Sequence, residues 1–158
     1  MQAWTAVLMV AILAAAAAPG IAGDGDAILG LWATEPDDED GNAHVEIFEQ
    51  DGTYHGRIVW LEKPVYGDDD EQGMAGQPKV DRENADPALR SRPILGLPIV
   101  AGFVFDGRGW HKGTIYDPDN GKTYRCKAQL GDHGELRVRG FVGVSLLGRT
   151  TTWTRVTP

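Results

Sequence analysis

The chain has 158 residues, a formal net charge of −8 and a single cysteine, Cys126. One cysteine excludes a disulfide framework, and the acidic balance argues against a nucleic-acid partner because phosphate binding needs a basic surface. The charge is uneven, since residues 23–83 hold 17 acids and 4 bases whereas residues 84–158 hold 6 acids and 11 bases. This asymmetry predicts a molecule with one acidic end.

The first 22 residues form an apolar leader. Residues 4–18 carry no charge, Pro19-Gly20 ends the apolar stretch, and Gly20 and Ala22 are small residues at the two positions that a signal peptidase reads. This pattern predicts a signal peptide over residues 1–22 and an exported protein, periplasmic or secreted. The apolar run is short for a span of about 20 residues, so we expect no membrane span after cleavage.

The mature chain, residues 23–158, is expected to fold as one domain in which eight β-rich segments alternate with turn signals. The segments are 30–34, 43–50, 53–61, 99–105, 110–116, 122–130, 135–142 and 147–156. Asp51-Gly52 and Asp106-Gly107 each separate two segments, and Asp-Gly between β-rich runs is a strong hairpin signal because the turn requires a positive φ. Short connections join antiparallel neighbours, so the order predicts an up-and-down meander.

Alternation along the segments supports this assignment. In residues 122–130, Tyr124, Cys126, Ala128 and Leu130 share one face and the more polar side chains share the other. One apolar face and one wet face are typical of a half-buried sheet. Eight such strands remove their exposed edges by closing on themselves, so we predict an all-β fold, a small antiparallel up-and-down β-barrel of about eight strands.

Residues 62–98 are the exception, an acidic loop between two strands. The loop is rich in proline and glycine and contains the run Asp68-Asp69-Asp70-Glu71. Asp86-Pro87 resembles the start of one helical turn, with an acidic N-cap followed by proline at the first helical position. Structureless loops of this length are uncommon unless they are functional or disordered, so this segment either covers the barrel mouth or stays mobile.

Two arginines have predicted structural roles. Trp32 and Arg155 lie on the first and last segments, which are neighbours in a closed meander, so the arginine can lie across the indole and close one barrel end. The alternative is a core tryptophan beside a surface arginine. Arg92 is expected to anchor the long loop to a carboxylate, for which Asp117 is the candidate.

The barrel interior is the predicted ligand site. An eight-stranded barrel either fills with side chains or holds one small ligand. The candidate lining residues are large side chains on inward faces: Tyr54, Trp60, Phe103 and Tyr124. Such a lining suits a small apolar or amphipathic molecule. The alternative is that these aromatic residues simply fill the core, and the glycines at 56, 102, 113 and 140 fit both readings.

No catalytic motif or metal-ligand spacing stands out. The four histidines lack a pattern such as H-E-x-x-H, and Cys126 lies on an apolar face, as expected for a buried inert thiol. We therefore expect a binding protein rather than an enzyme, with no metal and no cofactor. The second reading is a cell-envelope interaction or scaffold protein whose barrel is filled. The third is an enzyme that uses acid/base carboxylates or a histidine at the barrel mouth, which would require a perturbed titratable cluster in a cleft.

Seven sequence blocks in order resemble one family. They are 30–32, 54–59, 92–97, 113–118, 120–124, 139–143 and 147–156. Together they are similar to the exported bacterial proteins catalogued as domain of unknown function 2147, over nearly the whole mature chain. The resemblance implies a lipocalin-like barrel and no established activity. Trp32 and Arg155 match the tryptophan–arginine pair found in lipocalins, which supports the same architecture.

Overall fold

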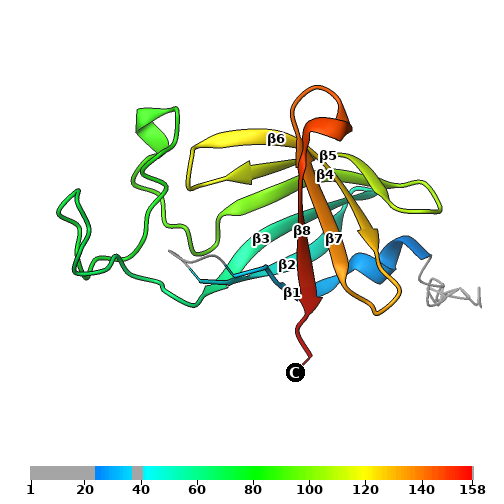
Figure 1. The fold of residues 1–158 in the computed structure, drawn as a ribbon, viewed down its shortest axis with the longest axis horizontal. Helices are drawn as coiled ribbons and strands as arrows, with labels where there is room; N and C mark the ends of the chain where they lie inside the picture. The colour runs from blue at the N-terminus through cyan, green and yellow to red at the C-terminus, as the bar shows by residue number, and fades with distance from the viewer. Residues whose placement is uncertain (1–23, 37–40, 158) are drawn as a thin grey trace, which may run out of the picture.

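The computed structural model describes residues 24–36 and 41–157, and the predicted signal peptide lies outside them. The described residues form a closed antiparallel barrel in which each strand pairs with the next in sequence (Figure 1). The strands are β1 (Gly30–Ala33), β2 (Ala43–Gln50), β3 (Thr53–Leu61), β4 (Pro98–Phe105), β5 (Trp110–Asp117), β6 (Lys122–Leu130), β7 (Leu136–Phe141) and β8 (Arg149–Arg155). The predicted all-β up-and-down barrel is therefore confirmed. Within the described part of the chain, no helix is long and apolar enough to cross a bilayer.

Pairing between β1 and β8 closes the barrel. Trp32 is registered with Arg155 and Ala33 with Thr154, and the backbone N–H of Val156 donates to the carbonyl of Leu31 at 2.9 Å. The first and last strands thereby satisfy each other's backbone groups, so neither is left as an exposed sheet edge.

A short 3-10 helix, η1 (Asp24–Ile28), plugs one end of this barrel, and the sequence analysis did not predict it. Its backbone accepts hydrogen bonds from two core indoles: Trp32 Nε1 donates to Ile28 O at 2.8 Å, and Trp110 Nε1 donates to Gly25 O at 3.1 Å. The Ile28 side chain is fully buried. The plug therefore supplies acceptors that buried tryptophans require.

Side chains fill the barrel interior. The largest fully buried ones are Trp32, Trp110 and Phe103. Gly113 makes room for one of these rings, because a Cβ at this position would overlap the ring of Phe103. Gly56 similarly lies against Val100, whose Cβ would be 3.1 Å from an added methyl group. These two glycines therefore accommodate neighbouring core side chains and not a ligand.

A β-bulge between β2 and β3 redirects Trp60. Val45 pairs with Ile58, whereas the preceding His44 pairs with Trp60, so β3 holds one extra residue at this point. A bulge re-aims the side chains that follow it. Trp60 accordingly lies on the outer side with His44, at 4.4 Å between ring centroids, and is 43% exposed. The prediction that Trp60 lines an internal cavity is wrong.

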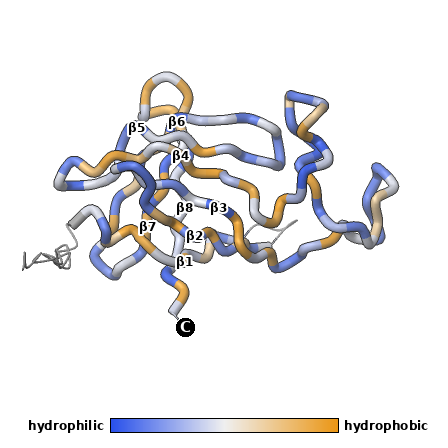
Figure 2. The backbone as a smooth tube through the Cα atoms, turned by 180° about the vertical axis from the view of Figure 1, so that it is seen from behind, coloured by the Kyte–Doolittle hydropathy of each residue, from blue (hydrophilic) through white to orange (hydrophobic). Residues whose placement is uncertain are grey.

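Residues 62–97, hereafter the arm, form an ordered segment that extends beyond the barrel (Figure 1). Figure 2 shows that hydrophilic residues dominate the tips of the arm. Isolated β-bridges join Val65 to Pro78 and Val80 to Pro93. The predicted helical turn is the 3-10 helix η2 (Pro87–Leu89), where the Asp86 carboxylate accepts from the Ala88 backbone N–H at 2.9 Å. The sequence predicts that this segment either covers the barrel mouth or stays mobile; in the structure its residues Ile94 and Leu97 pack into the hydrophobic core.

Candidate functional site

A pocket of about 320 Å³ opens at the barrel mouth, between the arm, the end of β3 and the β5–β6 turn. This mouth is at the end opposite η1, because η1 contacts Tyr54 near the start of β3 whereas Ile58 and Leu61 near its end line the pocket. The apolar lining residues are Ile58, Leu61, Tyr66, Val80, Ile94 and Ile99. The polar ones include Thr34, Asn42, Lys79, Arg82, Glu83 and Asp119. The lining thus combines apolar and polar side chains in similar number, a more polar composition than that of most small-molecule sites.

A buried carboxylate anchors the arm to the barrel. Asp81 is 0% exposed and accepts hydrogen bonds from Tyr116 Oη at 2.6 Å, Arg92 Nε at 2.7 Å and Asn84 Nδ2 at 2.7 Å. Tyr116 lies on β5 and the other three residues lie on the arm. Burial has the largest effect on the pKa of the Tyr116 phenol and raises it, and the hydrogen bond to Asp81 raises it further. The arm is therefore held by a fully paired buried acid, as burial of a charge requires.

The predicted contact between Arg92 and Asp117 is not formed. Arg92 does anchor the arm, but its partner is Asp81. Asp117 instead closes its own turn, where its carboxylate accepts from the Asp119 backbone N–H at 3.0 Å and from Asn120 Nδ2 at 2.7 Å. This local pairing is the ordinary use of aspartate in a turn, and it leaves the Asp117 carboxylate engaged with its own loop.

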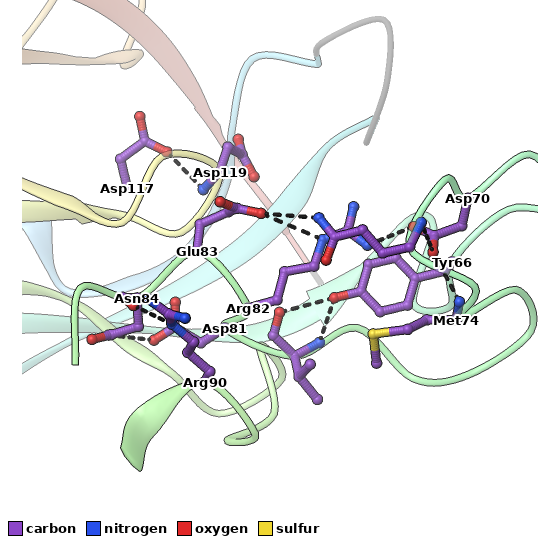
Figure 3. A network of polar contacts seen from close by, with 12 residues as sticks. Tyr66, Asp70, Met74, Asp81, Arg82, Glu83, Asn84, Arg90, Asp117 and Asp119 are labelled. Carbon is purple, nitrogen blue, oxygen red and sulfur yellow. Dashed lines mark hydrogen bonds and ion pairs between the residues drawn. The ribbon is translucent and has the colours of Figure 1, made fainter. Parts of the chain in front are cut away.

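A second cluster shapes the arm beside the pocket (Figure 3). Tyr66 Oη donates to Val80 O at 3.0 Å and accepts from Val80 N at 3.1 Å. The Arg82 guanidinium lies 4.3 Å from the Tyr66 ring centroid and binds Asp70 at 2.5 Å. That hydrogen bond from Arg82, with one from the Met74 backbone, holds the pKa of the Asp70 carboxyl below its ordinary value. Two pocket-lining residues, Tyr66 and Arg82, are thereby fixed in place.

Close backbone packing locks the arm against the β5–β6 turn. Gly121 has a φ of +67°, and a Cβ there would overlap the carbonyl oxygen of Glu83. Only glycine combines this left-handed conformation with such a close approach at little cost. The wall of the pocket is therefore set by a backbone contact as well as by side chains.

Asn42 lines the pocket and carries a buried, unsatisfied polar atom. Its Oδ1 is buried and, among the described residues, has no hydrogen-bond partner, whereas its backbone N–H donates to Glu62 Oε2 at 3.0 Å. A buried acceptor without a donor costs free energy.

The other residues predicted to line a cavity do not line this pocket. Phe103 is fully buried in the core. Tyr54 is also buried, and its hydroxyl donates to Asp26 of η1 at 2.9 Å; burial and this bond raise its pKa to about 12. Tyr124 is half-buried and its hydroxyl accepts from Asn120 Nδ2 at 3.1 Å. Tyr54 and Phe103 are thus structural, as the alternative reading of the aromatic set proposed.

Trp32 and Arg155 are brought together at the plugged end. The Arg155 guanidinium carbon lies 4.2 Å from the centroid of the Trp32 ring. The same side chain donates to Leu29 O at 2.8 Å and to Ala27 O at 2.6 Å. Arg155 therefore covers the indole and also binds the backbone just before β1, which fixes η1 across the barrel end.

Cys126 is the one cysteine of the chain and points into the core. Burial raises the pKa of its thiol to about 12, which suppresses the reactive thiolate. Within residues 24–36 and 41–157, no group of three histidine, cysteine, aspartate or glutamate side chains is close enough to hold a metal ion.

The closed eight-stranded meander, sealed by a tryptophan under an arginine, defines a lipocalin-like barrel. HP1028 from Helicobacter pylori, described as belonging to the lipocalin family, is similar in structure, with a TM-score of 0.68 and 22% sequence identity over 82% of each chain. At this identity the likeness shows the fold. The chain belongs to the family described as uncharacterized protein conserved in bacteria (DUF2147), which matches residues 30–155. No curated protein matches the chain.

Proposed function

We propose that this protein is a non-enzymatic binding protein, exported from the cytoplasm, that holds a small amphipathic molecule in the pocket at the barrel mouth. The observation that carries the proposal is the preformed pocket of about 320 Å³, which is lined by both apolar and polar side chains. Its arm wall is held by the buried Asp81 and by the Gly121 contact. A wall fixed in this way limits the ordering cost of binding.

The size of the pocket limits the ligand. Pockets for small molecules range from about 300 to 1,000 Å³, so this one fits a ligand at the small end. The filled interior prevents an acyl chain from running along the barrel axis, because Phe103 and Trp110 occupy that space. The apolar part of the ligand would contact Ile58 and Ile99, and its polar part would face the charged side chains Lys79, Arg82 and Glu83.

Native mass spectrometry of gently purified protein tests the proposal. Leu61→Trp fills the pocket from its rim, whereas Val59→Trp adds the same bulk to an exposed position on the same strand. We expect a retained small molecule on the parent chain and on Val59→Trp, and none on Leu61→Trp. The proposal fails if all three chains retain the same ligand, or if none retains a ligand and none binds a panel of short amphipathic molecules.

A second candidate function is interaction with the cell envelope through the outer surface. The specific observation is the exposed apolar connection between β7 and β8, where Leu146 is 88% and Leu147 80% exposed. These two leucines do not line the pocket at the barrel mouth, and exposed apolar residues of this kind mark surfaces that contact other molecules.

A further inference from the structure

The β7–β8 connection presents aliphatic side chains to solvent. The exposed members are Val142, Val144, Leu146 and Leu147. The connection, residues 142–148, is hereafter the apolar loop; it projects from the top of the barrel in both views, and Figure 2 colours much of it as hydrophobic. Contiguous exposed apolar residues mark surfaces that contact another protein, a membrane or a ligand.

The sheet beneath holds this loop so that its side chains face outward. Arg139 on β7 donates from Nε to Ser145 O at 2.7 Å and from Nη2 to Leu146 O at 3.2 Å. Arg125 on β6 donates to Gly143 O at 3.5 Å. A single 3-10 turn, η3 (Ser145–Leu147), shapes the tip. The backbone carbonyls thus face the sheet, which leaves the aliphatic groups for the outside.

The outer face around the loop is basic, although the whole chain has a charge of −8. Its basic residues are Arg108, Lys112, Arg125, Lys127, Arg137 and Arg139, hereafter the basic face. Two acids lie among them: Asp106 contacts His111 at 3.1 Å and Glu135 binds Arg137 at 2.7 Å.

The centre of the basic face has no carboxylate partner. Among the described residues, Arg125, Lys127 and Arg139 form no ion pair. Lys127 and Arg139 border a shallow depression of about 410 Å³ together with Arg108 and Arg137. Clustered cations around a depression of this size can receive phosphate groups, to which arginine binds with two donors.

We propose that the apolar loop and the basic face dock on the surface of a membrane that contains anionic phospholipid. Leu146 and Leu147 insert among the acyl chains, and Arg125, Lys127 and Arg139 meet the lipid phosphates. Membrane-surface binding combines buried apolar area with attraction between basic residues and anionic lipid. The inference is independent of the mouth pocket, since no residue that lines the pocket belongs to this surface.

A membrane fits this surface better than a second copy of the chain. A twofold dimer would bring two copies of the same patch together, and two basic faces would then repel each other. The exposed apolar side chains are also all aliphatic, whereas the centres of protein interfaces are enriched in aromatic residues that fill pockets.

Vesicle co-sedimentation of the full chain tests the proposal, with phosphatidylglycerol-containing vesicles compared with phosphatidylcholine vesicles. Leu146→Ser/Leu147→Ser should weaken binding at least about tenfold, and Arg125→Gln/Lys127→Gln about 25-fold, at about fivefold per charge. The matched controls are Leu89→Ser/Leu95→Ser, which removes exposed leucines from the arm, and Arg57→Gln/Lys63→Gln, which removes the same charge elsewhere. All variants keep the same N-terminus, so any contribution from the apolar leader is common to them.

A fluorescent label reports on the loop itself. A dye on Leu146→Cys should shift its emission to shorter wavelength with anionic vesicles, and a dye on Glu71→Cys should not. The buried Cys126 thiol, with its raised pKa, stays unlabelled in the folded chain. The proposal is overturned if neutral and anionic vesicles bind equally, if the loop variants bind like their controls, or if the loop variants instead dissociate a dimer of the free protein.

Discussion

Replacing Arg92 by methionine measures how far the buried Asp81 carboxylate depends on its cationic partner. Methionine keeps much of the side-chain length and removes the guanidinium. Asp81 is 0% exposed and keeps the donors of Tyr116 and Asn84. Breaking a buried ion pair costs about 3–5 kcal/mol. Because the Arg92 side chain is 36% exposed and two donors remain, we expect a loss of about 2–3 kcal/mol.

Denaturant unfolding gives the free-energy loss, and limited proteolysis of the arm shows where it acts. The matched control is Arg57→Met, whose ion pair with Glu46 has the same 2.7 Å separation but is largely exposed, so its loss should stay below about 1 kcal/mol. Asp81→Asn combined with Arg92→Met should recover part of the loss, because no charge is then left buried. The reasoning is refuted if Arg92→Met costs no more than Arg57→Met and leaves the arm as resistant to protease as before.

Three further predictions follow from the core and the arm. Gly113→Ala should destabilise the barrel by about 1–3 kcal/mol through overpacking, and Phe103→Leu in the same chain should recover part of this loss in denaturant unfolding; simple addition of the two losses would contradict it. Cys126 should react with a thiol reagent only as the protein opens. Because burial raises the pKa of its thiol from 9.0 to about 12, the folded state favours the neutral thiol. Its contribution to the free energy of unfolding is therefore complete below pH 9.0 and is lost as the pH rises towards 12. The hydrogen bond from Arg82 holds the pKa of the Asp70 carboxyl below 3.8 in the folded chain, so the contribution of this group to stability is present above pH 3.8 and is lost as the pH falls through the folded pKa. Hydrogen exchange of the arm should rise over that pH range, and Asp70→Asn should remove this pH dependence.

The barrel could be predicted because its signals are local. Asp51-Gly52 and Asp106-Gly107 mark the ends of strands, and alternation of period two marks the inward face. Trp60 shows where this reasoning fails. Its position in the alternation places it inside, but the bulge opposite His44 turns it outward. A bulge depends on the pairing of two strands, and neither strand alone contains the signal for it.

The arm and the pocket could not be predicted for a related reason. The arm has no period from which an inward face can be inferred, so Ile94 and Tyr66 gave no sign that they cover the barrel mouth. Arg92 was correctly expected to pair with a carboxylate, but a chain with 23 acidic residues offers many candidate partners. Among the described acidic residues, Asp81 is the buried one, and the sequence does not display burial.

The filled interior determines where the two proposed activities can lie. η1 closes one barrel end and Phe103 occupies the middle, so a ligand that reached past the mouth would have to displace a core aromatic residue. Moving such a side chain from the core into solvent costs about 1.5–3 kcal/mol, which a small ligand would have to offset in addition to its own binding cost. The proposed ligand binding is therefore confined to the mouth, while the apolar loop lies on the outer wall. Because the two surfaces share no residue, Leu61→Trp should abolish ligand retention without changing vesicle binding, and Leu146→Ser/Leu147→Ser should do the reverse.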